Sequence, residues 1–401
     1  MLILLIPIGL VLLVLAGIPY AIYFFGAKFG DKTMRPIRDV KGLKKIIVTS
    51  SAKLSKHTGE LLTKDLPDVS IVICAYNEER ILGKKLNNLL RCSYPLKKLE
   101  VVVMNDGSTD KTEAVARGAL EKIPVKWKII TNDPRLGKNR SMNKGMAHTS
   151  CDLVITTDAD VICERNAFEL LIRKLISDDS LAAVTGNQLP VRSMNVTTRL
   201  EKTYRSFFSR MCEWECAYDS TYNFNGNLIA VKKKLMTDIP EHYGADDANT
   251  AFVAIRQGYR TSYVSDAFVY EEIPKTMKLQ YIQKVRRAKR LIQATLKNRD
   301  LMRSARPFAR VFYPLRVWMY VVSPTLFFVG GGVFVVGLAL NWPWVLVLPI
   351  MVLVYLCMLL IRRGELVSAF LLNQFYLFAG LWFARRNPVL WESTSEKKNS
   401  N

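Results

Sequence analysis

Four aspartates, arranged as two close pairs, are the residues of this chain best suited to hold a metal ion or to accept a proton. The first pair, Asp158 and Asp160, ends the run DLVITTDAD, and the second, Asp246 and Asp247, stands in GADDANTA. Neighbouring carboxylates repel each other unless a cation or a basic side chain compensates their charge. The alternatives are a solvated turn for the first pair and an ordinary helix N-cap for one acid of the second.

The first pair follows one of four short apolar runs that have the composition of buried strands. These runs are rich in β-branched residues, and the segments between them have helical periodicity. The predicted strands are residues 69–76, 100–106, 127–133 and 152–158, and the predicted helices lie within 79–91, 109–122 and 137–148. This alternation predicts an α/β fold with a mainly parallel sheet, which holds ligands at the carboxyl ends of its strands.

Polar motifs stand at those carboxyl ends. The first strand runs into AYNEE (75–79), the second into NDGSTD (105–110) and the fourth into TDAD (157–160). Each motif supplies acids or amides that can contact a nucleotide or a metal ion. Taken alone, NDGSTD is better explained as a turn in which Ser108 or Asp110 caps the next helix. Three such motifs at successive strand ends indicate a binding site.

Long apolar segments near both ends of the chain predict membrane helices. Residues 1–26 carry no charge, exceed the roughly 20 residues that a spanning helix needs, and lack the features of a cleaved signal peptide. Residues 318–340 and 343–361 predict a hairpin through the membrane, and residues 366–383 either span it or lie at its interface.

Basic residues orient these segments, because positive charge near membrane ends tends to stay in the cytosol. The region after the first segment is basic, which places the middle of the chain in the cytosol. Its basic residues are Lys28, Lys32, Arg35, Arg38, Lys41, Lys44 and Lys45. Arg362 and Arg363 agree with this orientation, whereas Arg385 and Arg386 disagree with it if the third segment crosses.

The formal net charge of +22 does not by itself indicate nucleic acid. Much of the positive charge stands beside the apolar segments, where anionic lipid headgroups attract lysine and arginine. No zinc-finger, helix-turn-helix or RNP-like pattern accompanies it. The seven cysteines form no CxxC pair and the three histidines form no HExxH pattern, so we expect neither a nucleic-acid partner nor a zinc site.

Several motifs follow one another in a recognisable order. They are VSIVICAYNEE, VVVMNDGSTD, GKNRSMNKG, TTDADV, FNGNLIAV, GADDANTAFVAIRQGYR and QKVRR. In this order they resemble the family 2 inverting glycosyltransferases with the GT-A fold, over about residues 67–290. The membrane layout is similar to that of the processive branch, which includes chitin-oligosaccharide, hyaluronan, poly-N-acetylglucosamine and cellulose synthases. The resemblance implies a cytosolic GT-A (Rossmann-like) α/β domain with one N-terminal and two to three C-terminal transmembrane helices.

The resemblance assigns the first acid pair to the leaving group. A nucleotide sugar carries a diphosphate whose charge grows as the glycosidic bond breaks, and a divalent cation held by carboxylates stabilises it. By resemblance, Asp160 is the direct ligand of Mg²⁺ or Mn²⁺, and Asp158 lies near the metal and the sugar or ribose. The other implied donor-binding residues are Ala75, Tyr76, Glu78, Asp106 and Lys138. The alternative for Lys138 is an exposed helix start.

The second acid pair is assigned to the acceptor. Inversion in one step needs a general base, which by resemblance is Asp247, with Asp246 in support. The motif QKVRR resembles the family's QxxRW through Gln283 and Arg286, but Arg287 stands where tryptophan is expected. An arginine there can pair with phosphate, which favours a lipid phosphate or an unusual glycan as acceptor. The alternative is a basic face on the membrane surface.

We therefore predict a multi-pass protein of the cell membrane whose cytoplasmic domain transfers a hexose or N-acetylhexosamine from a UDP-sugar to a growing glycan. Processive extension with translocation is left open. The first alternative is transfer of a single sugar to a membrane lipid such as polyprenyl phosphate, and the second is a catalytically silent scaffold or sugar-nucleotide-binding regulator. The expected partners are the UDP-sugar, a glycan or lipid-linked acceptor and membrane lipids.

The predicted organisation has six parts. They are a transmembrane helix (1–26), a basic juxtamembrane linker (27–66), the GT-A domain (67–275), amphipathic interfacial helices with the QxxRR motif (276–317), transmembrane segments (318–383) and a polar tail (384–401).

Overall fold

The structure, a computed structural model, divides into two compact units. The described residues are 2–29, 66–191, 196–236, 239–241, 244–274, 276–360 and 364–384. The sheet unit comprises Met34–Val191, Glu215–Leu279 and Pro388–Asn401, and the helical unit comprises Met1–Thr33, Arg192–Trp214 and Gln280–Asn387. Nearly all of the predicted linker and tail lies outside the described residues. So do Lys32, Arg35, Arg38, Lys41, Lys44, Lys45, Arg362, Arg363, Arg385 and Arg386.

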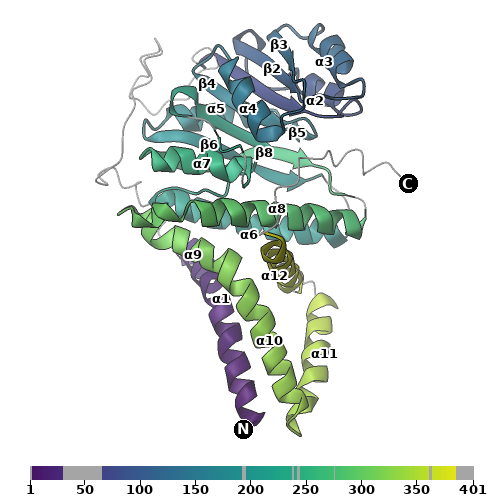
Figure 1. The fold of residues 1–401 in the computed structure, drawn as a ribbon, viewed down its shortest axis with the longest axis vertical. Helices are drawn as coiled ribbons and strands as arrows, with labels where there is room; N and C mark the ends of the chain where they lie inside the picture. The colour runs from purple at the N-terminus through teal and green to yellow at the C-terminus, as the bar shows by residue number, and fades with distance from the viewer. Residues whose placement is uncertain are drawn as a thin grey trace. The chain divides into compact units, whose positions relative to one another are not determined.

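The sheet unit is built on one eight-stranded sheet of order β3-β2-β1-β4-β7-β6-β8-β5 (Figure 1). The strands are β1 (Val69–Ala75), β2 (Leu99–Asn105), β3 (Lys126–Thr131), β4 (Leu153–Asp158), β5 (Val161–Cys163), β6 (Leu181–Pro190), β7 (Leu228–Lys232) and β8 (Arg260–Glu271). Strands β3, β2, β1 and β4 are parallel neighbours, whereas β7 is antiparallel to both β4 and β6. The predicted α/β fold is confirmed. Its four predicted strands form the parallel half of a mixed sheet.

Helices pack on both faces of this sheet because successive strand side chains point to opposite faces. Ile71 and Ile73 of β1 belong to the apolar core that includes α2, α3 and α5, and Val72 between them faces α4. These helices are α2 (Leu82–Leu89), α3 (Thr112–Leu120), α4 (Lys138–Ala147) and α5 (Ala167–Ile176), with α7 (Asp246–Arg256) packed near β6 and β8. Each fully buried aliphatic side chain contributes about 1.5–3 kcal/mol to folding, so the sheet is a rigid base for its loops.

The helical unit is formed mainly by helices of different lengths. They are α1 (Leu5–Phe29), most of α6 (Val196–Tyr218), most of α8 (Met277–Lys297), α9 (Tyr313–Val317), α10 (Ser323–Ala339), α11 (Val347–Leu360) and α12 (Glu365–Ala384). Two π-helical segments, Phe308–Phe312 and Trp318–Val322, flank α9 and make one continuous helix with α10. Short 3₁₀ segments occur in both units. They are Leu2–Leu4, Arg299–Arg303 and Trp344–Leu346 in the helical unit, and Leu96–Lys98 and Lys233–Leu235 in the sheet unit.

Among the described residues, three helices are long and apolar enough to cross a membrane. They are Leu2–Phe29, Phe308–Ala339 and Glu365–Ala384. The second begins at Phe308, whereas the predicted span begins at residue 318, so the last residues of the predicted interfacial region are its first turns. The predicted span 343–361 is a shorter apolar helix, Trp344–Leu359. Residues 366–383, expected either to span or to lie at the interface, form a helix of spanning length.

Glycines let α1 and α10 approach closely, and Figure 1 shows these two helices side by side. A Cβ atom on Gly9 would lie 2.5 Å from the backbone nitrogen of Phe334, and one on Gly330 would lie 2.6 Å from Leu12 Cβ. Both distances are too short for a real side chain. Small residues at helix interfaces allow this kind of contact in membrane proteins.

Polar side chains also join the helices of this unit. Arg316 is fully buried, with its guanidinium 4.6 Å from the centre of the Tyr23 ring and a 2.9 Å hydrogen bond donated to Tyr320 Oη. Gln374 of α12 donates a 2.6 Å hydrogen bond to Tyr20 Oη of α1. A buried cation over an aromatic face is a favourable contact when both are removed from water. These contacts tie α1 to two helices near the other end of the chain.

Candidate functional site

Lys138, the first residue of α4, brings two predicted acid motifs together. Its Nζ lies 2.8 Å from Asp158 Oδ1 at the end of β4 and 2.8 Å from Asp246 Oδ2 at the start of α7. The three side chains are only 10%, 22% and 12% exposed. Burial alone would lower the pKa of Lys138, but the two carboxylates outweigh it and raise the pKa above its ordinary value. Lys138 is therefore not the exposed helix start of the alternative interpretation.

The first acid pair occupies a turn between two strands. Asp158 is the last residue of β4, Ala159 is buried, and Asp160 lies directly before β5. Within the described ranges, no group of three or more His, Cys, Asp or Glu side chains could hold a metal ion. An ion at this turn would take at most two carboxylates from the protein and its remaining ligands from the substrate or water. This donor set suits Mg²⁺ or Mn²⁺, which are usually bound in this way beside phosphates.

The second acid pair lies in the first turn of α7. The N-cap residue is Ala245, so neither acid is the N-cap that was considered as an alternative. Asp247 accepts a hydrogen bond from the Gly226 amide at Oδ2 (3.2 Å) and from the Ala248 amide at Oδ1 (2.7 Å). Charged carboxylates are favoured at this end of a helix by the helix dipole. Asp247 is thus held in place by two backbone amides beside Asp246, which contacts Lys138.

Asp106, which directly follows β2, organises the loop that presents Lys138. It is fully buried and accepts hydrogen bonds from Asn132 Nδ2 (3.0 Å), Ser141 Oγ (2.8 Å) and the Leu136 amide (2.9 Å). The amide of Gly137 also donates to it at 2.9 Å, from a backbone with φ of 88° that favours glycine. Both carboxylate oxygens of Asp106 are therefore engaged by residues of this loop and of α4.

Arg135 stands beside two predicted residues and was missed by the sequence interpretation. Its guanidinium lies 3.5 Å from the centre of the Tyr76 ring, and its Nε lies 3.4 Å from Asp106 Oδ2. The available signal was a basic residue in the loop between a predicted strand and GKNR. Such a signal is weak because isolated arginines are usually solvated.

The AYNEE and NDGSTD loops hold each other in place. Asn77, with φ of 54°, donates its amide to Ser108 Oγ at 3.0 Å and accepts from the Thr109 amide at 2.9 Å. Asp110 accepts from the Thr112 amide at 2.9 Å beside the start of α3, but the N-cap residue of that helix is Lys111, so neither Ser108 nor Asp110 is the N-cap that was considered as an alternative. In the same loops, Ala75 accepts a hydrogen bond from the Asp106 amide, and the Glu78 side chain is buried.

Gln283, Arg286 and Arg287 lie on α8 and belong to the helical unit. Gln283 is buried, whereas both arginines are partly exposed. The other predicted site residues all belong to the sheet unit. Of these, the structure joins Lys138, Asp158 and Asp246 by direct contacts, and Asp247 and Asp160 are their sequence neighbours.

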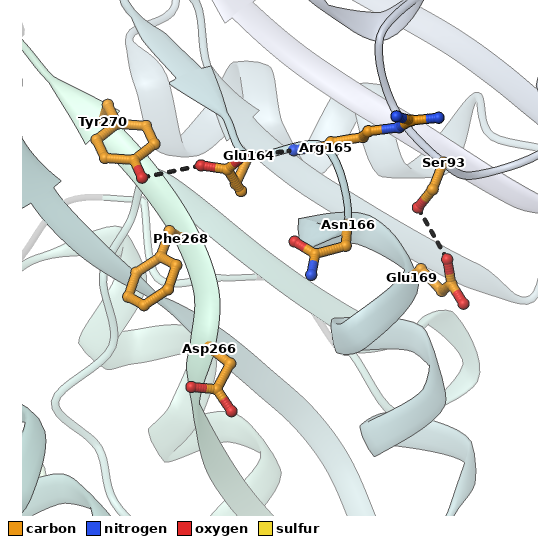
Figure 2. A pocket seen from close by; sticks show the side chains of 8 residues that line it. All are labelled: Ser93, Glu164, Arg165, Asn166, Glu169, Asp266, Phe268 and Tyr270. Atoms are coloured by element: carbon orange, nitrogen blue, oxygen red, sulfur yellow. Dashed lines mark hydrogen bonds between the residues drawn. The ribbon is translucent and has the colours of Figure 1, made fainter. Parts of the chain in front are cut away.

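A separate pocket of about 650 Å³ lies in the sheet unit and contains none of the predicted residues (Figure 2). Ser93, Glu164, Arg165, Asn166, Glu169, Asp266, Phe268 and Tyr270 line it. Figure 2 shows that two of its acids are engaged within the wall. Glu164 accepts from Tyr270 Oη and Glu169 accepts from Ser93 Oγ, both at 2.8 Å.

Comparisons with known proteins agree on one family and one fold. Residues 67–289 match the family described as "Glycosyltransferase like family 2". The chain is 27% identical over 235 residues to the probable glycosyltransferase YdaM of Bacillus subtilis, an alignment that covers 56% of each protein. It is 26% identical over 230 residues to poly-beta-1,6-N-acetyl-D-glucosamine synthase of Staphylococcus aureus, covering 55% of this chain and 54% of that protein. The chain thus spans about half the length of the curated relatives it matches.

One solved structure resembles nearly the whole chain. It is the mannosyltransferase PcManGT from Pyrobaculum calidifontis in complex with GDP-Man and Mn²⁺, with a TM-score of 0.74 and 22% identity. The match covers 95% of this chain and 98% of that one, and it shows a shared fold.

Proposed function

The chain belongs to glycosyltransferase family 2, and on this premise we propose that it transfers a hexose or N-acetylhexosamine from a UDP-sugar to a growing glycan, with inversion. The observation that carries the proposal is the double contact of Lys138. It brings the strand-end acid Asp158 and the helix-start acid Asp246 to one basic group. One residue proposed for the leaving group and one proposed for the acceptor side therefore both contact the amino group of Lys138.

The donor side is proposed to use the first acid pair. Asp160 and Asp158 would hold a Mg²⁺ or Mn²⁺ ion, which when bound compensates the negative charge of the diphosphate. Lys138 adds a buried positive charge beside them, and its contacts with carboxylates can be exchanged for contacts with phosphate oxygens. Tyr76 and Arg135, stacked on each other, would flank the nucleotide base.

Three other predicted donor residues act in positioning under this proposal. Asp106 holds the loop that ends at Lys138, and Ala75 and Glu78 lie where the first strand meets the NDGSTD loop. These contacts keep the donor-binding loops in one arrangement before the substrate arrives. Preorganisation of this kind reduces the cost of ordering the site during the reaction.

The acceptor side is proposed to use the second acid pair. Asp247 takes the proton of the acceptor hydroxyl while that oxygen bonds to the anomeric carbon and the bond from this carbon to the diphosphate breaks. The amides of Gly226 and Ala248 orient its two oxygens. Asp246 is proposed to support Asp247 from the neighbouring position, where its own side chain is held by Lys138. Gln283, Arg286 and Arg287 of α8 are proposed to contact the acceptor or the diphosphate.

A second candidate is transfer of one sugar to a membrane lipid such as polyprenyl phosphate. One observation favours it: Arg287 stands where the resembled family has a tryptophan in its acceptor site, and an arginine there can pair with a phosphate. The fold shared with a mannosyltransferase solved with GDP-Man makes GDP-mannose a further donor to test. The three apolar helices support placement in the cell membrane for both candidates, with the sheet unit proposed to face the cytoplasm.

A donor screen with the purified protein in lipid nanodiscs tests the proposal. UDP-glucose, UDP-N-acetylglucosamine and GDP-mannose would each be supplied with Mn²⁺, and the release of nucleoside diphosphate and the product mass would be measured. A polymer made from a UDP-sugar supports the first candidate, and only singly glycosylated lipid supports the second. Nucleotide binding without release from any donor would favour the silent scaffold or regulator and refute both transferases.

A further inference from the structure

The turn that carries Asp158 and Asp160 joins two strands that do not pair with each other. β4 pairs with β1 and β7 inside the sheet, whereas β5, in the part of the chain described, pairs with β8 at the edge. No ladder of backbone hydrogen bonds therefore links the two arms of the turn. Because neighbouring carboxylates also repel each other, other contacts have to hold these arms together.

Lys85 of α2 connects the two arms. It is fully buried, and its Nζ donates to Thr157 Oγ1 at 2.8 Å and to Cys163 Sγ at 3.2 Å. Thr157 is the residue before Asp158 on β4, and Cys163 is the last residue of β5. A fully buried lysine is unusual because its amino group must replace the hydrogen bonds that it made with water. Here it replaces them with groups from both sides of the acid turn.

Asn88, one helical turn after Lys85, holds the β5 arm by its backbone. Its Nδ2 donates to the Cys163 carbonyl at 3.0 Å, and its Oδ1 accepts from the Cys163 amide at 2.9 Å. One residue thus supplies the donor and the acceptor that a neighbouring strand would offer.

The contacts continue from Thr157 toward the second acid pair. Thr157 Oγ1 accepts from Lys85 and donates its own proton to the Asn227 carbonyl at 2.7 Å. The preceding residue, Gly226, donates its amide to Asp247. Lys85 therefore lies at one end of a series of contacts. The series passes through Thr157, next to Asp158, and ends at Asp247.

We propose that Lys85 and Asn88 form a clamp that positions the turn of Asp158 and Asp160 to receive a nucleoside diphosphate and its divalent cation. The ligand named in this inference rests on the proposed function, whereas the contacts of the clamp do not depend on it. Lys85 and Asn88 act through Thr157 and Cys163, so they are positioning residues. The carboxylates need to be fixed in advance, because small displacements of the groups that bind the reacting part of a substrate lower the reaction rate strongly.

Lys85→Met tests the clamp, with Lys232→Met as the matched control. Lys232 is also buried, but its Nζ lies near the carbonyls of Asp178 and Asp179. In Lys85→Met we expect faster amide hydrogen exchange within residues 157–163 and about 10-fold weaker binding of UDP or GDP in the presence of Mn²⁺. Calorimetry measures the binding. The control should match the wild type in both measurements.

Substitutions of Thr157 provide a second route if Lys85→Met does not fold. Thr157→Val removes the hydroxyl and should reproduce both effects, whereas Thr157→Ser keeps it and should restore them. The double variant Lys85→Met/Thr157→Val should bind nucleotide no more weakly than either single variant, since both break one chain of contacts.

Two results would overturn the clamp. One is unchanged exchange and binding in folded Lys85→Met or Thr157→Val, and the other is faster exchange across the whole sheet unit, which would show a general structural role. Failure of the wild type to bind UDP or GDP with Mn²⁺ would instead refute the proposed function. The exchange measurement would then still decide whether the clamp exists.

Discussion

The two ends of the parallel half of the sheet both bury charge, but they compensate it differently. At the amino ends of the strands, Glu100 accepts hydrogen bonds from Ser70 Oγ and from the amide of Ser150, and it lies 3.1 Å from Lys128 Nζ. At the carboxyl ends, Lys138 is shared between Asp158 and Asp246. All the groups around Glu100 come from the strands and loops that it joins. The partners of Lys138 come from two motifs with proposed roles in binding and catalysis.

The difference indicates which end is built for stability and which for function. Burial alone would raise the pKa of Glu100, but hydrogen bonds from Ser150, Ser70 and Lys128 lower it to about 2. Its contacts are complete without a ligand. The contacts of Lys138 are ionic and lie beside a turn of two acids, where under the proposed function a diphosphate and a cation would replace them. Changes at the carboxyl ends should therefore affect turnover, and changes at the amino end should affect folding.

Among the substitutions, Asp247→Asn should have the largest effect on turnover. An amide cannot take the acceptor proton, so the rate should fall by about 10²–10⁴-fold, the usual contribution of a general base. Nucleotide binding, measured by calorimetry, should stay within a factor of about two to three of the wild type because Asp247 does not contact the donor in this scheme. Asp266→Asn, an acid of the separate pocket, is the control and should be fully active. Undiminished turnover in Asp247→Asn would show that Asp247 is not the general base.

Removal of the metal should separate the two acid pairs. A chelator should abolish turnover, and Mn²⁺ should restore it. Asp160→Asn should raise the Mn²⁺ concentration needed for half-maximal rate by about 10–100-fold. Asp247→Asn should leave that concentration unchanged. The assignment of the metal to the first pair fails if both variants shift it equally, or if a chelator has no effect.

Lys138→Met should have a smaller effect on the rate and a distinct effect on its pH dependence. We expect the rate to fall about 10-fold or more, with the acidic limb of the pH–rate profile at higher pH, because two carboxylates would face each other without a cation. In the wild type, the raised pKa of Lys138 keeps this group charged past its ordinary titration range near 10.4, so the alkaline limb should not report it. Lys126→Met, at an exposed position, is the control. An unchanged profile in folded Lys138→Met would contradict the shared-cation arrangement.

Glu100→Gln should change turnover least and stability most clearly. A pKa lowered from 4.5 to about 2 corresponds to roughly 3 kcal/mol of folding free energy at neutral pH. Because the folded-state pKa is depressed, this stabilisation is present above the unfolded value and is lost as the pH falls toward 2. The wild type should therefore unfold at a higher temperature than Glu100→Gln at pH 7, and the gap should narrow below about pH 4.5. Equal melting temperatures at pH 7, or a large loss of turnover at unchanged stability, would contradict the assignment of the amino ends of the strands to stability.

Much of the site could be predicted because parallel strands bring sequential motifs to one edge. The strand runs were clear from their β-branched composition, so the sequence alone was enough to put Asp106 and Asp158 at the carboxyl ends of strands in one mainly parallel sheet. The contact between Lys138 and Asp246 could not be predicted, since it depends on the antiparallel insertion of β7 between β4 and β6. No local pattern in the sequence specifies that pairing.

Basic residues that the fold removes wholly or partly from solvent were the other limit of prediction. Lys85 and Arg135 stand in segments where lysine and arginine are normally solvated, and the sequence offers no sign that a fold will enclose them. Lys85 is enclosed because β5 leaves β4 and passes beside α2, and Arg135 because Tyr76 lies over its guanidinium. Both depend on contacts between segments far apart in the sequence. The positions of glycine and proline mark the loops between such segments but do not give their paths.

The close contact of α1 with α10 also concerns how the protein is made. A ribosome produces α1 first, and roughly 280 residues separate Phe29 from Phe308, where the helical run containing α10 begins. At about 5–20 residues per second, α1 must wait on the order of 15–55 s for its partner. During that interval the surface around Gly9 lacks the partner surface that Phe334 later supplies. The order of synthesis therefore leaves this surface of α1 without its partner helix for most of translation.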